Sequence, residues 1–253
     1  MAHPKSVLNI LVLIMLPCLG VRIYACQCSY PLPPCAEYWR AEAVFVGTVI
    51  EITPNLPATG HLPKHRIRFA LERPYRGVKG SEVELTQHST NCAFTFEKGG
   101  KYFVYAYRDR EDNSLITSGC TGTHEFSPDS ESLAYVHALA EGKSERAISG
   151  AILKQRTDPF AGAKVLIKGD GAKYETVSDK EGHFKVIVLK SGRYKVSVIL
   201  PPRSNLIGAG EELQDIAKFE ETDKSTTAIY EVNIGVRECA FIYVPLFLAK
   251  DGP

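Results

Sequence analysis

The chain has 253 residues, of which 44% are hydrophobic and 23% are charged. This length allows two ordinary domains with a core each, and the composition is that of a globular protein and not of a disordered chain. The 30 basic residues nearly balance 29 acidic ones, which argues against nucleic acid or an anionic membrane as the main partner, because both need a concentrated positive field.

The first 25 residues predict a signal peptide for export. Lys5 precedes a run from Val7 to Leu19 that is apolar apart from Asn9, and the small residue Ala25 ends the segment. A basic start, an apolar centre and a small residue before the cleavage point are typical of such a signal. The run is too short to cross a membrane, which takes about 20 apolar residues, and no later stretch approaches that length. We therefore expect a secreted, extracellular chain with Cys26 as its first mature residue and no transmembrane segment.

A second interpretation of the same junction predicts a lipid anchor. Residues 23–26, Ile-Tyr-Ala-Cys, resemble a bacterial lipobox, in which the thiol of the cysteine (here Cys26) is lipidated and its amine is acylated. Tyr24 stands where a small or β-branched residue is usual. This departure favours the secreted form over a form anchored at the cell surface.

Six cysteines remain once Cys18 leaves with the signal segment. They are Cys26, Cys28, Cys35, Cys92, Cys120 and Cys239. An even number of cysteines in an exported chain favours disulfide bonds over zinc ligation.

Residues 26–142 predict short strands followed by a helix. Apolar side chains mark five strands, at residues 43–52, 66–72, 82–85, 101–107 and 115–120. Residues 35–42 predict a short helix, and residues 53–63 predict a long exposed connection. The last helix is expected to begin at Ser127, with Pro128 in its first position, and to end at Gly142. Five strands with packed helices fit a small closed barrel of the OB type.

From Ala147 onward the pattern predicts strands alone. Alternating apolar side chains mark them, namely Val165 and Ile167, then Phe184, Val186 and Val188, then Tyr194, Val196 and Val198, and then the runs 230–234 and 240–244. Residues 201–225 predict an edge loop or a partly mobile segment. Short strands at such regular spacing predict a β-sandwich of the seven-stranded type. The expected fold class is therefore mainly β, with one domain at residues 26–142 and another at residues 146–253.

Both regions carry motifs that resemble known families. In the first region these are Cys26-Gln27-Cys28, Cys35, Ala43-Val44-Phe45-Val46-Gly47-Thr48, Tyr75-Arg76-Gly77, Cys92, Lys101-Tyr102-Phe103-Val104 and Cys120. Their order resembles the netrin-like domain of the tissue inhibitors of metalloproteinases. In the second region, over about residues 146–250, they are Ser149-Gly150, Ala161-Gly162-Ala163-Lys164-Val165, Asp179 to Gly182 with Phe184, and Ser191-Gly192-Arg193-Tyr194. These look like a carboxypeptidase regulatory-like domain of the transthyretin type, a likeness that implies a fold and says little about activity.

The first resemblance implies how the cysteines pair. It would join Cys26 to Cys92 and Cys28 to Cys120. The family's third cysteine in this region pairs with one just beyond the helix, and this chain has no cysteine there. The next one is Cys239, so we predict that a Cys35–Cys239 bridge staples the two domains together.

The same resemblance implies an inhibitory mechanism at the mature N-terminus. In such inhibitors the free α-amine and the backbone carbonyl of the first cysteine chelate the catalytic zinc of a metalloprotease. Here Cys26 would be the chelating residue, and Gln27 would enter the specificity pocket. Cys28 and Ser29 would lie in the contact surface. Gln27 is longer than the small hydroxyl residue usual in the family and would need a roomier pocket.

Other interpretations stay open on the sequence alone. The Cys26-Gln27-Cys28 motif can serve only as a disulfide anchor, and the chain can be an adhesion, glycan-binding or structural surface module with no inhibitory activity. The sequence contains no nucleophile elbow, P-loop, HExxH motif or dinucleotide fingerprint. We therefore expect a non-enzymatic protein that recognises another protein, with no catalytic residue and no cofactor.

The remaining polar candidates predict structural roles. His61 and His65 are expected at the surface, because they straddle Pro63 in a predicted loop. His137 is expected to pack against the core on the apolar stripe of the last helix, and Trp39 is expected to fill the core.

Three acidic residues, Asp109, Glu111 and Asp112, lie between two predicted strands. They predict a solvated turn. Carboxylates this close together leave weak calcium binding as an alternative.

Overall fold

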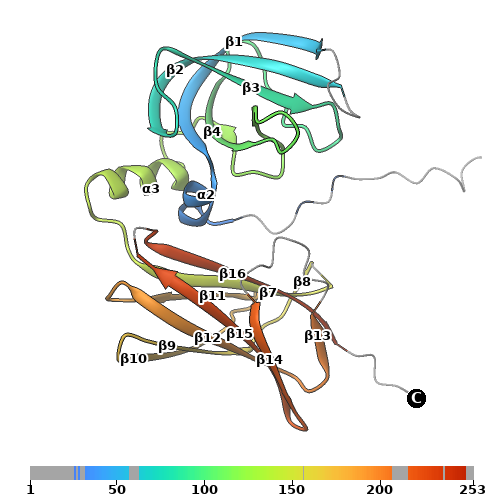
Figure 1. Ribbon diagram of the computed structural model, residues 1–253, viewed down its shortest axis with the longest axis vertical. Helices are drawn as coiled ribbons and strands as arrows, with labels where there is room; N and C mark the ends of the chain where they lie inside the picture. The colour runs from blue at the N-terminus through green and yellow to red at the C-terminus, as the bar shows by residue number, and fades with distance from the viewer. Residues whose placement is uncertain are drawn as a thin grey trace, which may run out of the picture.

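The computed structural model describes Cys26, Cys28 and residues 32–56, 63–155, 157–206, 216–235 and 237–248, and it is mainly β (Figure 1). The coarse fold class predicted from the sequence is confirmed. The predicted signal segment, Gln27, Ser29 and His61 lie outside the described residues. Within the described ranges, one sheet is built from residues 43–125 and two sheets are built from residues 147–248.

The N-terminal sheet closes on itself. Its strands are β1 (Ala43–Leu56), β2 (Lys64–Arg76), β3 (Glu82–His88), β4 (Lys101–Arg108), β5 (Leu115–Ile116) and β6 (His124–Glu125). They pair in the order β1-β2-β3-β5-β4-β6, and β4 also pairs with β1, so that β1, β2, β3, β5 and β4 form a closed ring. The register between β1 and β2 shifts at Gly47, where a Cβ would lie 2.9 Å from the carbonyl oxygen of Ala70. Such irregularities bend a strand and help a sheet to curve.

Both faces of β1 and β4 are buried. Phe45 and Val104 pack with Phe69 of β2 and Leu85 of β3 in the core that the ring encloses. The alternate side chains, among them Phe103, pack in a second core under the helices. This two-sided burial explains the almost continuous apolar pattern at the start of β1 and along β4.

Two helices, α2 (Pro34–Arg40) and α3 (Glu131–Ala140), lie between the ring and the C-terminal sheets (Figure 1). The start predicted for α3 is wrong, because its N-cap is Ser130, whose hydroxyl accepts a hydrogen bond from the backbone N–H of Leu133. The burial predicted for His137 is wrong too, since this side chain is exposed. The helix turns Leu133 and Val136 to the core instead, flanked by the half-buried Tyr135 and Leu139.

Two strand boundaries in the ring also differ from the prediction. β1 continues to Leu56 and pairs with β2 there, so residues 53–56 are strand and not the start of a loop. β5 ends at Ile116, because the Thr117 hydroxyl donates to the carbonyl of Tyr105 and turns the chain away. The two-residue strand β6 was not predicted, since two residues are too few to show a period.

Two sheets form the C-terminal part. Their strands are β7 (Ala147–Lys154), β8 (Asp158–Pro159), β9 (Lys164–Gly169), β10 (Ala172–Val177), β11 (His183–Ile187), β12 (Gly192–Leu200), β13 (Ser204–Leu206), β14 (Ile216–Thr222), β15 (Ser225–Ile234) and β16 (Cys239–Leu248). One sheet has the order β10-β9-β12-β15-β14 and the other has the order β11-β7-β16-β13, with β8 paired to β7. Both sheets contribute to one buried core, for example through Ile148 and Val244 on one side and Val165 and Tyr194 on the other.

The loop predicted over residues 201–225 is wrong in part. β13 and β14 lie within it, while residues 207–215 are outside the described ranges. Residues 218–222 of β14 are exposed, so this strand shows no alternation between buried and exposed side chains. A strand without that alternation gives no signal in the sequence.

A third disulfide ties the two halves together. Cys35, in α2, is bonded to Cys239, the first residue of β16, across a sequence separation of 204 residues. This is the pair that was predicted. Beside it, the Ser144 hydroxyl donates to the Glu238 carboxylate. Trp39 of α2 donates its indole N–H to the Tyr135 hydroxyl of α3 at 2.9 Å, so both helices and β16 meet at this junction.

Removal of the Cys35–Cys239 bridge should lower stability. We expect the double variant Cys35→Ser with Cys239→Ser to lose about 2–4 kcal/mol of unfolding free energy, because the bridge restricts a very long loop in the unfolded chain. Urea unfolding followed by the fluorescence of Trp39, the single tryptophan, measures this directly. A loss below about 1 kcal/mol would show that non-covalent contacts alone hold the junction.

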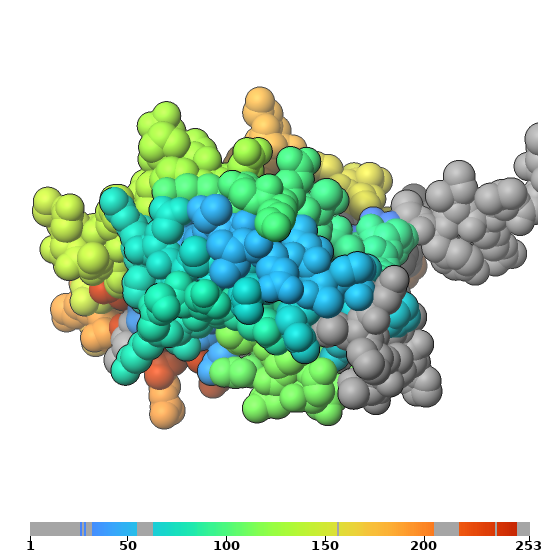
Figure 2. All heavy atoms as spheres, turned by 90° about the horizontal axis from the view of Figure 1, so that it is seen from above, coloured from blue at the N-terminus to red at the C-terminus, as the bar shows by residue number. Residues whose placement is uncertain are grey.

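The outer face of β1, β2 and β3 carries exposed ion pairs. Arg68 bonds Glu51 at 2.8 Å, and Arg66 bonds Glu84 at 3.0 Å, with all four side chains about half exposed. Figure 2 looks onto this part of the molecule from above, where β1 to β3 make up most of the visible surface. Pairs of this kind contribute little to stability and keep the face solvated.

Among the described residues, no helix has the length and the apolar character needed to cross a membrane.

Candidate functional site

The start of the described chain is held by two disulfides. Cys26 is bonded to Cys92, in the loop after β3, and Cys28 is bonded to Cys120, in the loop between β5 and β6. The Cα–Cα distance is 5.1 Å in each pair. These are the pairs that the family resemblance implied. Two anchors two residues apart fix both the position and the direction of this segment.

The two bridges are in contact with each other. The Sγ of Cys26 lies 3.9 Å from that of Cys28 and 3.5 Å from that of Cys120. Cys28 is exposed, whereas Cys26, Cys92 and Cys120 are half-buried. The four sulfurs therefore form one cluster at the surface of the ring.

Hydrogen bonds order each of the two anchoring loops and join one loop to the other. The N–H of Gly119 donates to the carbonyl of Cys92 at 2.7 Å. The N–H of Cys92 donates to the Thr90 hydroxyl, and the N–H of Cys120 donates to the Ser118 hydroxyl, both at 3.2 Å. The platform beneath Cys26 and Cys28 is thus ordered by its own contacts.

Threonine hydroxyls attach the second loop to β4. Thr117 and Thr123 both donate to the carbonyl of Tyr105, at 2.9 and 3.1 Å. Thr121 donates to the carbonyl of Ser118 at 2.9 Å. Cys120 lies between Thr117 and Thr123, so its loop is tied to β4 of the ring.

The buried carboxylate of Glu37 links the same loop to α2. It accepts hydrogen bonds from the Tyr107 hydroxyl and from the N–H of Gly122, the latter at 3.0 Å. Burial, and then the negative charge of Glu37, raise the pKa of Tyr107 well above its ordinary value, so its hydroxyl keeps the proton that it donates. Glu37 was missed in the sequence, because one acidic residue in a short helix gives no signal of burial.

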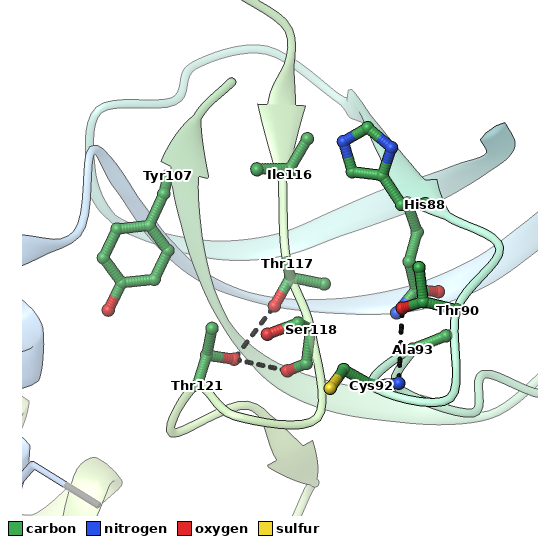
Figure 3. A pocket seen from close by; sticks show the side chains of 10 residues that line it. His88, Thr90, Cys92, Ala93, Tyr107, Ile116, Thr117, Ser118 and Thr121 are labelled. Atoms are coloured by element: carbon green, nitrogen blue, oxygen red, sulfur yellow. Dashed lines mark hydrogen bonds between the residues drawn. The ribbon is translucent and has the colours of Figure 1, made fainter. Parts of the chain in front are cut away.

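A cavity of about 290 Å³ opens beside Cys92 (Figure 3). It is lined by the ends of β3 and β4 and by the two anchoring loops, including Tyr107, Thr117 and Thr121. Gln87 also lines it; this side chain is buried, and its Nε2 has no hydrogen-bond partner among the residues described. The surface next to the anchored segment is therefore hollow, and the lining of this hollow is mainly apolar.

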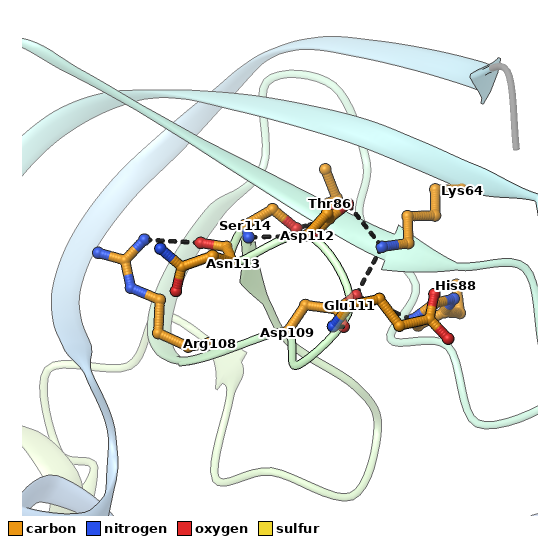
Figure 4. Close-up of polar contacts among 9 residues, drawn as sticks. All are labelled: Lys64, Thr86, His88, Arg108, Asp109, Glu111, Asp112, Asn113 and Ser114. Atoms are coloured by element: carbon orange, nitrogen blue, oxygen red, sulfur yellow. Dashed lines mark hydrogen bonds and ion pairs between the residues drawn. The ribbon is translucent and has the colours of Figure 1, made fainter. Parts of the chain in front are cut away.

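A charge cluster joins Lys64, at the start of β2, to the turn that follows β4 (Figure 4). The ammonium of Lys64 lies 2.5 Å from a carboxylate oxygen of Asp109 and 2.8 Å from one of Asp112. Only about 5% of the Lys64 side chain and 6% of the Asp109 side chain are exposed. The prediction of a solvated turn is therefore wrong for Asp109. The Lys64 ammonium lies between these two carboxylates, and its positive charge disfavours a calcium ion in the same place.

The pKa values in this cluster follow from the pairing. Burial alone would raise the pKa of Asp109, but hydrogen bonds from Lys64 and from the N–H of Glu111 outweigh it and hold the pKa below its ordinary value. Hydrogen bonds from Lys64 and Ser114 lower the pKa of Asp112 much further. Both groups are thus carboxylates at neutral pH.

Acid should destabilise the ring through these two aspartates. A carboxyl group with a lowered pKa in the folded state stabilises the protein above its ordinary pKa, and this stabilisation is lost as the pH falls below that value. We expect the unfolding free energy to fall as the pH drops below about 4. Chemical denaturation between pH 7 and pH 2 measures this slope, and Asp109→Asn with Asp112→Asn should flatten it. An unchanged slope in this variant would contradict the assignment.

The other candidates have structural positions. His65 is half-buried and bonds the Ser89 hydroxyl through Nε2 at 2.7 Å. Trp39 is half-buried between α2 and α3, with the Arg76 guanidinium 5.2 Å from its ring centre.

Comparisons with known proteins identify no family for this chain. No protein-family model matches the chain, and a search of curated proteins found no significant match.

Proposed function

We propose that the chain is an exported, non-enzymatic inhibitor of zinc metalloendopeptidases. In this proposal a signal peptide is removed after Ala25, and Cys26 becomes the first residue. Its free α-amine and its backbone carbonyl then chelate the catalytic zinc of the protease. Gln27 would enter the specificity pocket, with Cys28 and Ser29 in the contact surface.

The observation that carries the proposal is the double anchoring of Cys26 and Cys28. A terminal amine is normally mobile, and fixing it on binding costs free energy. Here the bridges to Cys92 and Cys120 fix the segment before any partner arrives. The bound conformation is therefore prepared in advance, which is the general route to tight binding by a rigid surface.

The chemistry of an α-amine suits a catalytic zinc ion. Its ordinary pKa is near 8, so a usable fraction is neutral at pH 7 and can donate its lone pair. Catalytic zinc keeps a coordination position for water, and an N,O pair from one residue can take its place. A lipid on the Cys26 sulfur would exclude the Cys26–Cys92 disulfide, because the thioether and the disulfide need the same sulfur atom.

The finer fold assignment belongs to the same proposal. We assign the closed ring with its helices to an OB-type barrel over residues 26–142, similar to the netrin-like domain of the metalloproteinase inhibitors. We assign the two later sheets to a β-sandwich over residues 146–253, similar to a carboxypeptidase regulatory-like domain. The five-strand closure and the core shared by the two later sheets support these assignments.

An inhibition assay tests the proposal. The mature chain beginning at Cys26 should inhibit at least one zinc endopeptidase from a representative panel with 1:1 stoichiometry. It should compete with a small zinc-chelating inhibitor for the active site of that enzyme, and it should leave a serine endopeptidase unaffected. Absence of inhibition across the panel, or inhibition without competition by the chelator, would overturn it.

Exposed apolar side chains favour adhesion as the second candidate function. Val177 of β10 is 58% exposed, Phe219 of β14 is 47% exposed, and Leu189, which follows β11, is 79% exposed. β10, β11 and β14 are all edge strands, which can pair with an extended segment of a partner. A chain that binds cell surfaces or glycans and inhibits no metalloprotease would favour this candidate.

A further inference from the structure

Three of the four sulfurs at the mature N-terminus lie close enough together to hold one metal ion, and the fourth adjoins them. The sulfurs of Cys26, Cys92 and Cys120 all lie within 4.8 Å of one another, and the sulfur of Cys28 is 3.9 Å from that of Cys26. They come from three segments, namely the N-terminal motif and the two anchoring loops. Such convergence from separate segments is typical of structural metal sites.

The spacing between sulfurs of different bridges matches a zinc–thiolate tetrahedron. A Zn–S bond of about 2.3 Å places the sulfurs of a tetrahedral site about 3.8 Å apart. Two of the four distances between the bridges, 3.5 Å from Cys26 to Cys120 and 3.9 Å from Cys26 to Cys28, lie on either side of this value. The two bonded pairs would have to separate, and the sulfur of Cys28, which lies outside the group of three, would have to move toward that of Cys92 to admit the ion.

The loops that carry the ligands are also held by hydrogen bonds that involve no sulfur atom. These are the bond from Gly119 to the Cys92 carbonyl and the bonds from Cys92 to Thr90 and from Cys120 to Ser118. Two thiols are thereby held next to each other. Cys26 and Cys28 supply two more from one short segment.

We propose that the reduced chain binds one Zn²⁺ ion through the thiolates of Cys26, Cys28, Cys92 and Cys120. A phosphine or dithiol reductant gives two electrons to each disulfide, and the sulfurs take up protons from water to form four thiols. Zinc binding then releases the four thiol protons to solvent and leaves a closed four-sulfur site.

This site is independent of the proposed inhibition. It uses four side-chain sulfurs and neither the α-amine nor the carbonyl of Cys26, so a chain that still carries its leader can form it too. In the reduced state the ion would hold the N-terminal segment where the bridges hold it in the oxidised state.

Cobalt titration of the reduced mature chain tests the site. With a phosphine reductant and without oxygen, one equivalent of Co²⁺ should produce the intense visible bands of tetrahedral cobalt together with thiolate-to-metal charge transfer, and Zn²⁺ should abolish both. The variant Cys35→Ser with Cys239→Ser should keep the full signal, because those sulfurs belong to the distant bridge. Cys28→Ser and Cys92→Ser should lose the four-sulfur spectrum.

Alkylation of the unmodified chain gives a second readout that does not depend on how the variants fold. With zinc bound to the reduced chain, iodoacetamide should modify Cys35 and Cys239 while Cys26, Cys28, Cys92 and Cys120 stay protected, as peptide masses would show. Equal modification of all six cysteines would overturn the proposal. So would a cobalt signal that survives in Cys28→Ser, or one that is lost in the Cys35 and Cys239 double variant.

Discussion

A single alanine added before Cys26 is expected to reduce inhibition of a sensitive zinc endopeptidase by about 100-fold or more, equivalent to about 2.7 kcal/mol of binding free energy. The addition converts the α-amine into an amide, which has no lone pair to donate to zinc. It also places a residue where the metal should lie. Inhibition constants of the two mature chains, measured side by side, give the ratio.

The fold must be shown to survive this addition. The extended chain should keep the Cys26–Cys92 and Cys28–Cys120 bridges, which peptide mapping without reduction checks, and its urea midpoint should not change. Acetylation of the α-amine in the unextended chain is the matched chemical control, and it should give a similar loss. Equal inhibition by the free, acetylated and extended chains would rule out chelation by Cys26.

Replacement of Lys64 by methionine is expected to cost about 3–5 kcal/mol of unfolding free energy. The variant removes the ammonium from the buried carboxylate of Asp109 and from Asp112, and leaves only the imidazole of His88, 3.2 Å away, beside Asp109. An uncompensated buried charge costs far more than the pair itself contributes. Denaturant unfolding at pH 7 measures the loss.

A matched exposed pair provides the control. Lys101 pairs with Glu72 at the surface, where both side chains are more than a third exposed. Lys101→Met should therefore cost less than about 1 kcal/mol. The Lys64 variant should also lose less stability than the wild type as the pH falls toward 3, because protonation removes its unpaired charge. Equal losses in the two variants would show that the Lys64 cluster is solvated.

The parts of the fold that were predictable are those where burial imposes a period. Side chains along β2 alternate between buried (Ile67 and Phe69) and exposed (Arg66 and Arg68). The same alternation of apolar and charged residues is present in the sequence and predicted the strand. α3 was located but its start was misplaced, because Ser127 and Ser130 are both acceptable N-caps. Packing of Leu133 and Val136 against the second core decides between them, and that packing is not a local property.

Contacts between distant segments were the part that could not be predicted from residues alone. Lys64 and Asp109 are 45 positions apart, and their charges look like ordinary surface charges until β2 and the end of β4 are placed side by side. The cavity beside Cys92 is likewise assembled from separate segments. The cysteine pairs were expected only through a family resemblance, since six cysteines allow fifteen pairings.

The coordination of the protease metal is the most direct test of the account. A zinc endopeptidase that the chain inhibits should be substituted with Co²⁺, and its visible spectrum recorded as the mature chain is added. We predict that the cobalt bands change in proportion to inhibition and saturate at one equivalent, while the chain with an acetylated Cys26 amine leaves them unchanged. Full inhibition by the free-amine chain with an unaltered cobalt spectrum would contradict chelation by Cys26.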